Sequence, residues 1–175
     1  MITFHADDFG INAEQSKRIL DCRKNGVLNS VSIIPNSRHL SETIPLIDSG
    51  CKIGIHINLA EGRCLADKDQ IPYLADKNGF FKNSFMKLFL LSVVHRKDVI
   101  KQAETEVYEQ IQAVLALLPD EYKIRIDSHI HYHMIPAVFC GFCRALMKTG
   151  REVEYIRYPV EKISVYKKIR LHTSK

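Results

Sequence analysis

The residues best suited to chemistry lie in one short segment, Asp127-Ser-His-Ile-His-Tyr-His133. Alternate side chains of an extended strand point to the same face, so the carboxylate and the three histidines would share one face. Four ionisable groups directed at one spot are costly to bury unless something binds them. Neutral imidazole and carboxylate are standard ligands of divalent metals, so the segment predicts a metal site.

Two further segments carry metal-ligand residues beside expected strands. His5-Ala-Asp-Asp-Phe-Gly10 continues an expected strand over residues 2–6, and Gly54-Ile-His-Ile-Asn58 lies within one over residues 52–59. In parallel α/β folds, ligands bind where the carboxyl ends of the strands meet the loops that follow. Because all three polar clusters lie at strand ends, we expect them to form one site.

Several of these residues also have purely structural explanations. Asp7 and Asp8 could cap the helix that follows, and His56 could be a hydrogen-bonded core histidine. Two adjacent carboxylates repel each other, however, which favours a cation bound to one of them. Cys140 and Cys143 form a C-x-x-C pair within an expected helix, and no second pair accompanies them, so we interpret them as structural. We assign no role to the histidines outside the second and third segments.

Composition indicates one ordinary domain. The chain has 175 residues, of which 46% are hydrophobic and 26% charged, enough for a sizeable core. The net charge is +5, but basic and acidic residues are mixed except in the tail Lys162–Lys175, and no basic patch with interleaved aromatics indicates nucleic-acid binding. The apolar run Phe85–Val94 is too short to span a bilayer, so we expect no membrane partner. Five cysteines and the lack of a signal peptide before Ile2 predict a cytoplasmic protein.

Strand patterns alternate with helix patterns along the chain. The expected strands cover residues 2–6, 30–35, 52–59, 123–128 and 154–158, and the expected helices cover residues 13–24, 41–48, 98–118 and 137–148. The helix over 98–118 is the clearest, because its apolar residues recur at helical spacing and Pro119 follows its end. Such alternation predicts an α/β domain with a mainly parallel sheet.

Residues 60–84 interrupt this alternation. They contain Gly62, Pro72 and Gly79, show little periodicity, and directly follow the strand that carries His56. Long loops in compact domains are usually either functional or disordered. The position beside His56 favours a lid or substrate-binding loop, and the alternative is a mobile insertion without substrate contact.

The three segments resemble the signature segments of the YdjC-like carbohydrate deacetylases, which include the chito-oligosaccharide deacetylases. Their order and spacing match, and the likeness extends over the whole chain to Tyr155–Pro159. The resemblance implies a (β/α) barrel of the polysaccharide-deacetylase type. It also implies hydrolysis of the N-acetyl group of an amino sugar or chito-oligosaccharide with one divalent metal, usually described as magnesium. Ligand type by itself favours zinc, because imidazole is softer than the usual oxygen ligands of magnesium, so both metals stay open.

The resemblance also implies roles for individual residues. It makes Asp8, His56 and His129 the metal ligands, Asp7 the general base and His133 a second catalytic residue, with His131, Asn58 and Arg157 in contact with substrate. For His131 and His133 three roles stay open: ligand orientation, substrate contact and proton delivery. Such a site would contain the parts of a metal-assisted amidase, namely an activated water, a base for its proton, and a histidine to protonate the leaving amine.

The number of expected strands bears on whether the barrel can close and on whether the chain is active alone. A closed parallel barrel needs about eight strands, whereas this sequence supplies five. We therefore expect a single domain with an incomplete barrel, in which Ile156 and Tyr158 face water. Such a chain would self-associate as a homo-oligomer or be completed by a partner, and would have little activity alone. Two other functions stay open: a metal-dependent phosphoesterase, because H-x-H motifs also serve two-metal phosphate chemistry, and a truncated, non-catalytic sugar-binding homologue.

Overall fold

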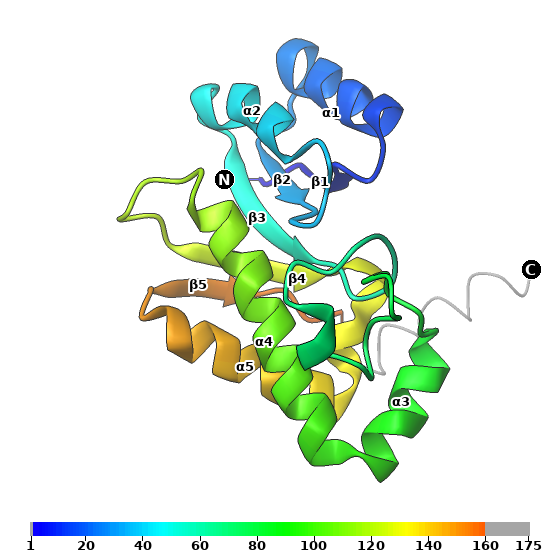
Figure 1. Ribbon diagram of the computed structural model, residues 1–175. Coiled ribbons are helices and arrows are strands. Elements are labelled where there is room, and N and C mark those ends of the chain that lie inside the picture. Colours follow the sequence, from blue (N-terminus) through cyan, green and yellow to red (C-terminus); the bar gives the residue numbers. More distant parts are fainter. Residues whose placement is uncertain (1, 160–175) are drawn as a thin grey trace, which may run out of the picture.

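The computed structural model describes residues 2–159 and contains one parallel sheet whose strands follow chain order (Figure 1). The strands are β1 (His5–Phe9), β2 (Ser30–Ile33), β3 (Lys52–Ile57), β4 (Ile124–Ser128) and β5 (Val153–Ile156), and each pairs in parallel with the next. Right-handed crossovers between sequential strands place the connecting helices on one face of a sheet, as in a (β/α) barrel and unlike a doubly wound sheet. The expected α/β class is confirmed.

Helices connect the strands within this described part of the chain. The α-helices are α1 (Ala13–Asn25), α2 (Ile44–Asp48), α3 (Phe85–Val94), α4 (Arg96–Leu115) and α5 (Pro136–Thr149), and the short 3₁₀ helices are η1 (Leu40–Thr43), η2 (Lys68–Gln70) and η3 (His129–Met134). The side chain of Asn12 caps α1 by accepting a hydrogen bond from the backbone N–H of Gln15. The four expected helices are present with shifted ends, whereas the sequence did not predict α3.

The core lies between the sheet and the helices that cover it; α4 and α5 contribute many of its residues, and α1 and α2 contribute Ile19 and Leu46. Ile53, Ile55 and Ile57 of β3 are almost fully buried, as expected for a parallel strand. Helices α4 and α5 run side by side (Figure 1). They approach closely at Gly141, where a Cβ atom would lie only 2.5 Å from the carbonyl oxygen of Ile100. A glycine at this position therefore permits the packing of the two helices.

Strand β5 forms the outer edge of the sheet within residues 2–159. Tyr158, just beyond it, is 49% exposed, as expected, whereas Ile156 is half-buried and packs against the core. The basic tail Lys162–Lys175 lies outside the described residues. A search of the described helices finds none that is both long and apolar enough to cross a membrane.

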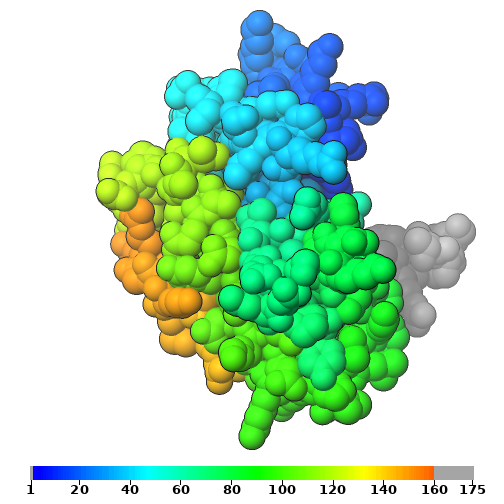
Figure 2. Space-filling view, in the orientation of Figure 1, coloured from blue at the N-terminus to red at the C-terminus, as the bar shows by residue number. Residues whose placement is uncertain are grey.

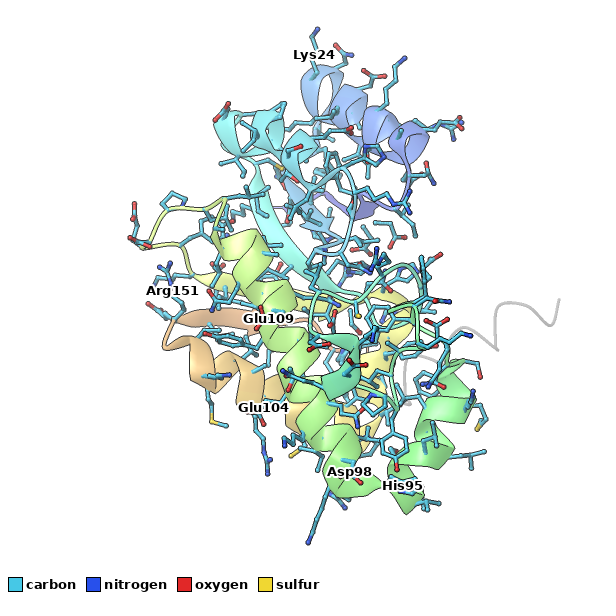
Figure 3. The ribbon with its side chains drawn as sticks, in the orientation of Figure 1. Lys24, His95, Asp98, Glu104, Glu109 and Arg151 are labelled. Atoms are coloured by element: carbon cyan, nitrogen blue, oxygen red, sulfur yellow. The ribbon has the colours of Figure 1, made fainter. Side chains whose placement is uncertain are left out.

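The loop formed by residues 60–84 packs onto the rest of the molecule. Together with α3 it forms the teal-to-green surface in Figure 2. Ile71, Leu74 and Phe81 bury their side chains in the core. Tyr73 stacks on His95 with 4.6 Å between ring centroids, where α3 meets α4 (Figure 3). The loop therefore has its own hydrophobic anchors.

A row of buried polar side chains on α4 fixes the same loop. Gln102, Glu106 and Gln110 are spaced by four residues and so lie on one face of the helix. Gln102 Oε1 accepts from the backbone N–H of Tyr73 at 2.8 Å, and Glu106 accepts from the N–H groups of Leu65 and Ala66. Because these contacts satisfy buried backbone groups, they hold the loop in one position beside the strand ends.

Candidate active site

The two adjacent carboxylates lie at the end of β1, where the strand is irregular. Its register with β2 shifts between Ala6 and Phe9, and Asp8 has a φ of 66°. Aspartate is among the few residues besides glycine that adopt this left-handed conformation readily. A regular strand would direct Asp7 and Asp8 to opposite faces. With this irregularity Asp8 contacts His56 and His129 at the carboxyl ends of β3 and β4, while Asp7 contacts His5 of its own strand.

Asp8, His56 and His129 come together as one group, which we call the ligand triad. One ligand atom of each residue lies within 4.8 Å of the other two. Asp8 Oδ1 is 3.1 Å from His56 Nε2 and 2.7 Å from His129 Nδ1. The structure thus brings together the three predicted ligands from the ends of β1, β3 and β4.

Asp127 fixes the ring of His56 from the other side. These two residues are register partners on β3 and β4, both are buried, and His56 Nδ1 lies 2.5 Å from Asp127 Oδ1. Burial by itself lowers the pKa of His56, but hydrogen bonds with Asp127 and Asp8 outweigh it and raise this pKa to about 9. The hydrogen bond with His56 in turn lowers the pKa of Asp8.

Two further aspartates, Asp7 and Asp127, lie beside the ligand triad, and we call them the acid pair. The Nη2 atom of Arg157 lies 2.6 Å from a carboxylate oxygen of each. His5 Nε2 lies 3.0 Å from the same Asp7 oxygen, Oδ1. Within residues 2–159, Asp7 Oδ2 has no hydrogen-bond partner. Burial raises the pKa of Asp7, but His5 and Arg157 more than offset this and hold it well below the usual range.

The sequence did not identify His5 as a member of the site. His5 Nδ1 bonds to Ser30 Oγ at 2.8 Å, which orients the ring with Nε2 toward Asp7. The two-residue period of a strand could have indicated His5, because residues 5 and 7 share one face of β1. No comparable local signal was available for the contact between Asp7 and Arg157, since these residues are far apart in the chain.

The expected strand over residues 123–128 agrees with β4, but the expectation that Asp127, His129, His131 and His133 share one face of an extended chain is wrong. Ile130 and His131 have φ values of 40° and 58°, so the chain turns into η3 and then α5. Left-handed backbone in a β-branched residue such as isoleucine is strained, and such strain concentrates at functional sites. His129, His131 and His133 therefore do not share a face.

The two later histidines occupy different environments as a result. His131 is exposed, whereas His133 is buried and stacks on Phe142 with 5.9 Å between centroids. His133 Nδ1 pairs with Ser128 Oγ, and its Nε2 has no hydrogen-bond partner among the described residues. Burial, followed by the neighbouring His131, lowers the pKa of His133. The roles of both histidines stay predictions.

Asn58 is buried and uses its side chain to shape the turn after β3. Its Oδ1 accepts from the backbone N–H groups of Ala60 and Glu61 at 3.0 and 3.2 Å, and its Nδ2 donates to Asn36 Oδ1. Its backbone in turn bonds to the side chain of Gln110 on α4. Substrate contact by Asn58, like that by His131 and Arg157, stays a prediction.

Glu61 is a further residue of the site that the sequence did not reveal. Its Oε1 lies 3.3 Å from His129 Nε2, and its side chain is largely exposed. The turn that presents it is held by Gln110 through Asn58. The available signal was indirect: polar residues at four-residue spacing on the otherwise apolar face of residues 98–118 indicate a buried polar contact.

Comparison with known proteins identifies relatives of the whole chain. A sequence model described as YdjC-like protein matches residues 1–174. A carbohydrate deacetylase of Thermoanaerobacter pseudethanolicus is 29% identical over 163 residues, which are 91% of this chain and 61% of that protein. A carbohydrate deacetylase of Danio rerio is 28% identical, over 89% of this chain and 48% of that protein. A chitooligosaccharide deacetylase of Yersinia pestis is 28% identical, over 79% and 53% respectively. The chain thus spans about half to three fifths of the length of these relatives.

Solved structures also share the fold. One of them is a protein of Enterococcus faecalis V583 whose name assigns it provisionally to cellobiose-phosphate cleavage. The two structures superpose with a TM-score of 0.69 at 22% identity, over 98% of this chain and 63% of that one. At this identity the likeness concerns the fold alone.

Proposed function

Because this chain belongs to the YdjC-like protein family, we propose that it hydrolyses the N-acetyl group of an amino sugar or chito-oligosaccharide with the help of one divalent metal. The observation that carries the proposal is the adjacency of the ligand triad to Asp7, an ionised carboxylate with one oxygen free among the described residues. The relatives named as carbohydrate deacetylases support the same reaction class.

The donor set of the triad suits a divalent cation. Two imidazoles and one carboxylate are a common combination for zinc, and carboxylate also suits magnesium, so both metals remain candidates. The hydrogen bond from His56 to Asp127 is the orienting contact that metal-bound histidines usually make through their second nitrogen. When bound, the metal would supply an acidified water and polarise the acetyl carbonyl.

Asp7 is proposed as the base that accepts the proton of the attacking water. Its Oδ1 is held by His5 and Arg157, which leaves Oδ2 for this transfer. Its low pKa keeps it ionised near neutral pH, so that this free oxygen can accept a proton.

His133 is proposed to protonate the leaving amine. Burial lowers its pKa, so the ring would be mostly neutral near pH 7; it would first take up a proton and would then give it up readily. His131, Asn58 and Arg157 are proposed to contact the sugar, His131 being the exposed member of the three.

The phosphoesterase alternative needs a second metal, and the acid pair is where a second group of ligands lies. His5, Asp7 and Asp127 have ligand atoms within 4.8 Å of one another. The guanidinium of Arg157 already contacts both carboxylates, however, and so provides a positive charge there. This contact disfavours two-metal chemistry and favours a single metal in the triad.

The test combines metal titration with acetate release from N,N′-diacetylchitobiose by the 175-residue chain. We expect release to stop with a chelator, to return with Mg²⁺ or Zn²⁺, and to be absent in His129→Ala. Metal-dependent release of phosphate from p-nitrophenyl phosphate, without acetate release, would instead indicate a phosphoesterase. Sugar binding without either product would indicate a non-catalytic homologue.

A further inference from the structure

A cleft of about 380 Å³ adjoins the ligand triad on the side of β1 and β2. This volume lies within the range of about 300–1,000 Å³ that is usual for small-molecule sites. Its lining includes Gly10, which follows the carboxylates of β1, and Asn36, which follows β2. Asn58 and Glu61 also line it, and Glu61 Oε1 lies 3.3 Å from His129 Nε2. The cleft therefore adjoins the proposed catalytic site through the side chain of Glu61.

One wall of the cleft is the ring of Phe80, which is 41% exposed. Its neighbour Phe81 is turned into the core instead. The turn before Phe80 is well fixed: Asp76 Oδ1 accepts from the backbone N–H groups of Asn78 and Phe80 at 2.8 and 3.0 Å, and Gly79 takes a φ of 79°. The aromatic ring is thus presented to the cleft by a rigid turn.

Hydrogen-bond donors stand next to this ring. Arg63 pairs with Phe80 across an antiparallel bridge, and its guanidinium carbon lies 5.8 Å from the centroid of the ring. Asn36 Nδ2 donates to the carbonyl oxygens of Glu61 and Arg63 at 3.1 and 2.9 Å, which fixes the loop segment that carries Arg63. An apolar ring face beside polar donors matches a pyranose, whose faces are lined by C–H groups and whose edge carries hydroxyls.

We propose that this cleft binds the sugar ring adjacent to the N-acetylated ring that is hydrolysed, with Phe80 against its C–H face and Arg63 donating to its hydroxyls. The inference rests on the proposed function, since it places the reacting ring at the triad. It makes Phe80 a determinant of preference for disaccharides over monosaccharides.

The test measures the affinity of the full chain for N,N′-diacetylchitobiose and for N-acetylglucosamine, by saturation-transfer NMR titration. An Asp7→Asn background keeps both sugars intact. We expect Phe80→Ala to weaken the affinity for the disaccharide roughly three- to tenfold, as for loss of one aromatic contact, and to change that for the monosaccharide less than twofold. Phe80→Tyr should retain the affinity of the parent, whereas Phe80→Leu should lose it although the side chain stays apolar.

Phe89→Ala is the matched control, because Phe89 is 38% exposed but lies on α3 and does not line the cleft. Unchanged disaccharide affinity in Phe80→Ala, an equal loss for both sugars, or binding of neither sugar by the parent would overturn the inference. Disaccharide binding that depends on Phe80, in a wild-type chain that releases no acetate, would uphold this subsite and reject the proposed reaction.

Discussion

The ligand triad and the acid pair with its neighbour His5 both consist of aspartate and histidine, yet the negative charges of their carboxylates are compensated differently. The acid pair has Arg157 between its carboxylates, at 2.6 Å from each. Within residues 2–159, Asp8 forms no ion pair with lysine or arginine, and its partners are His56 and His129. The acid pair therefore receives a permanent positive charge from a guanidinium, whereas the partners of Asp8 are titratable imidazoles.

This difference explains why only one of the two groups is proposed to hold a metal. Partly or fully buried carboxylates need a compensating charge, and a guanidinium that bridges Asp7 and Asp127 supplies it. In the triad the compensating charge comes from protonated imidazole, as the raised pKa of His56 shows. A metal can replace such protons, whereas it cannot replace the guanidinium without expelling a side chain.

The largest expected effect separates the two neighbouring carboxylates. Asp7→Asn should retain the metal and lose turnover by about 10²–10⁴-fold, the range for one general acid–base group. Asp8→Asn should lose the metal itself. Metal content by elemental analysis and acetate release are measured for both variants. Equal loss of metal in the two variants would show that the triad and the acid pair act as one joint binding group.

A smaller effect is expected where the two groups meet. Asp127 bonds to both His56 and Arg157, and Asp127→Asn would remove the charge that orients the metal-ligating ring. Loss of such an orienting carboxylate typically costs about 10–100-fold in metal affinity. Calorimetric titration with Zn²⁺ measures the change, and Asp120→Asn, at an exposed aspartate outside the site, is the control. An unchanged affinity would mean that Asp127 serves Arg157 alone.

A change of one pH unit should alter the metal affinity less than the Asp127→Asn substitution does. Because the pKa of His56 is raised to about 9, its ring is protonated at pH 6–8 and a metal must displace that proton. The apparent metal affinity should therefore rise about tenfold for each pH unit over this range. Calorimetry in buffers of different ionisation enthalpy would show proton release on binding. A flat affinity profile would contradict the competition between proton and metal.

From the sequence, the location of the site was predicted correctly more often than the orientation of its side chains. The three polar segments and their strands were evident, because His56 and Asp127 lie on regular strands whose period is fixed. The predicted side-chain orientations were wrong where the backbone departs from regular strand geometry, at Asp8, Ile130 and His131. The alternation of faces along a strand does not reveal residues in the left-handed conformation. Contacts across the fold, such as Glu61 with His129, depend on the buried polar row of α4 and have no local signature.

The most direct test of the account is the metal content of the purified chain and of His129→Ala after equilibration with Zn²⁺ or Mg²⁺ and removal of free ion. His129 supplies the triad with a ligand from the end of β4 and contacts Asp8 at 2.7 Å. The account predicts one ion per wild-type chain and none in the variant, with the thermal unfolding of the metal-free proteins little changed. One ion per chain in His129→Ala, or none in the wild type, would contradict it.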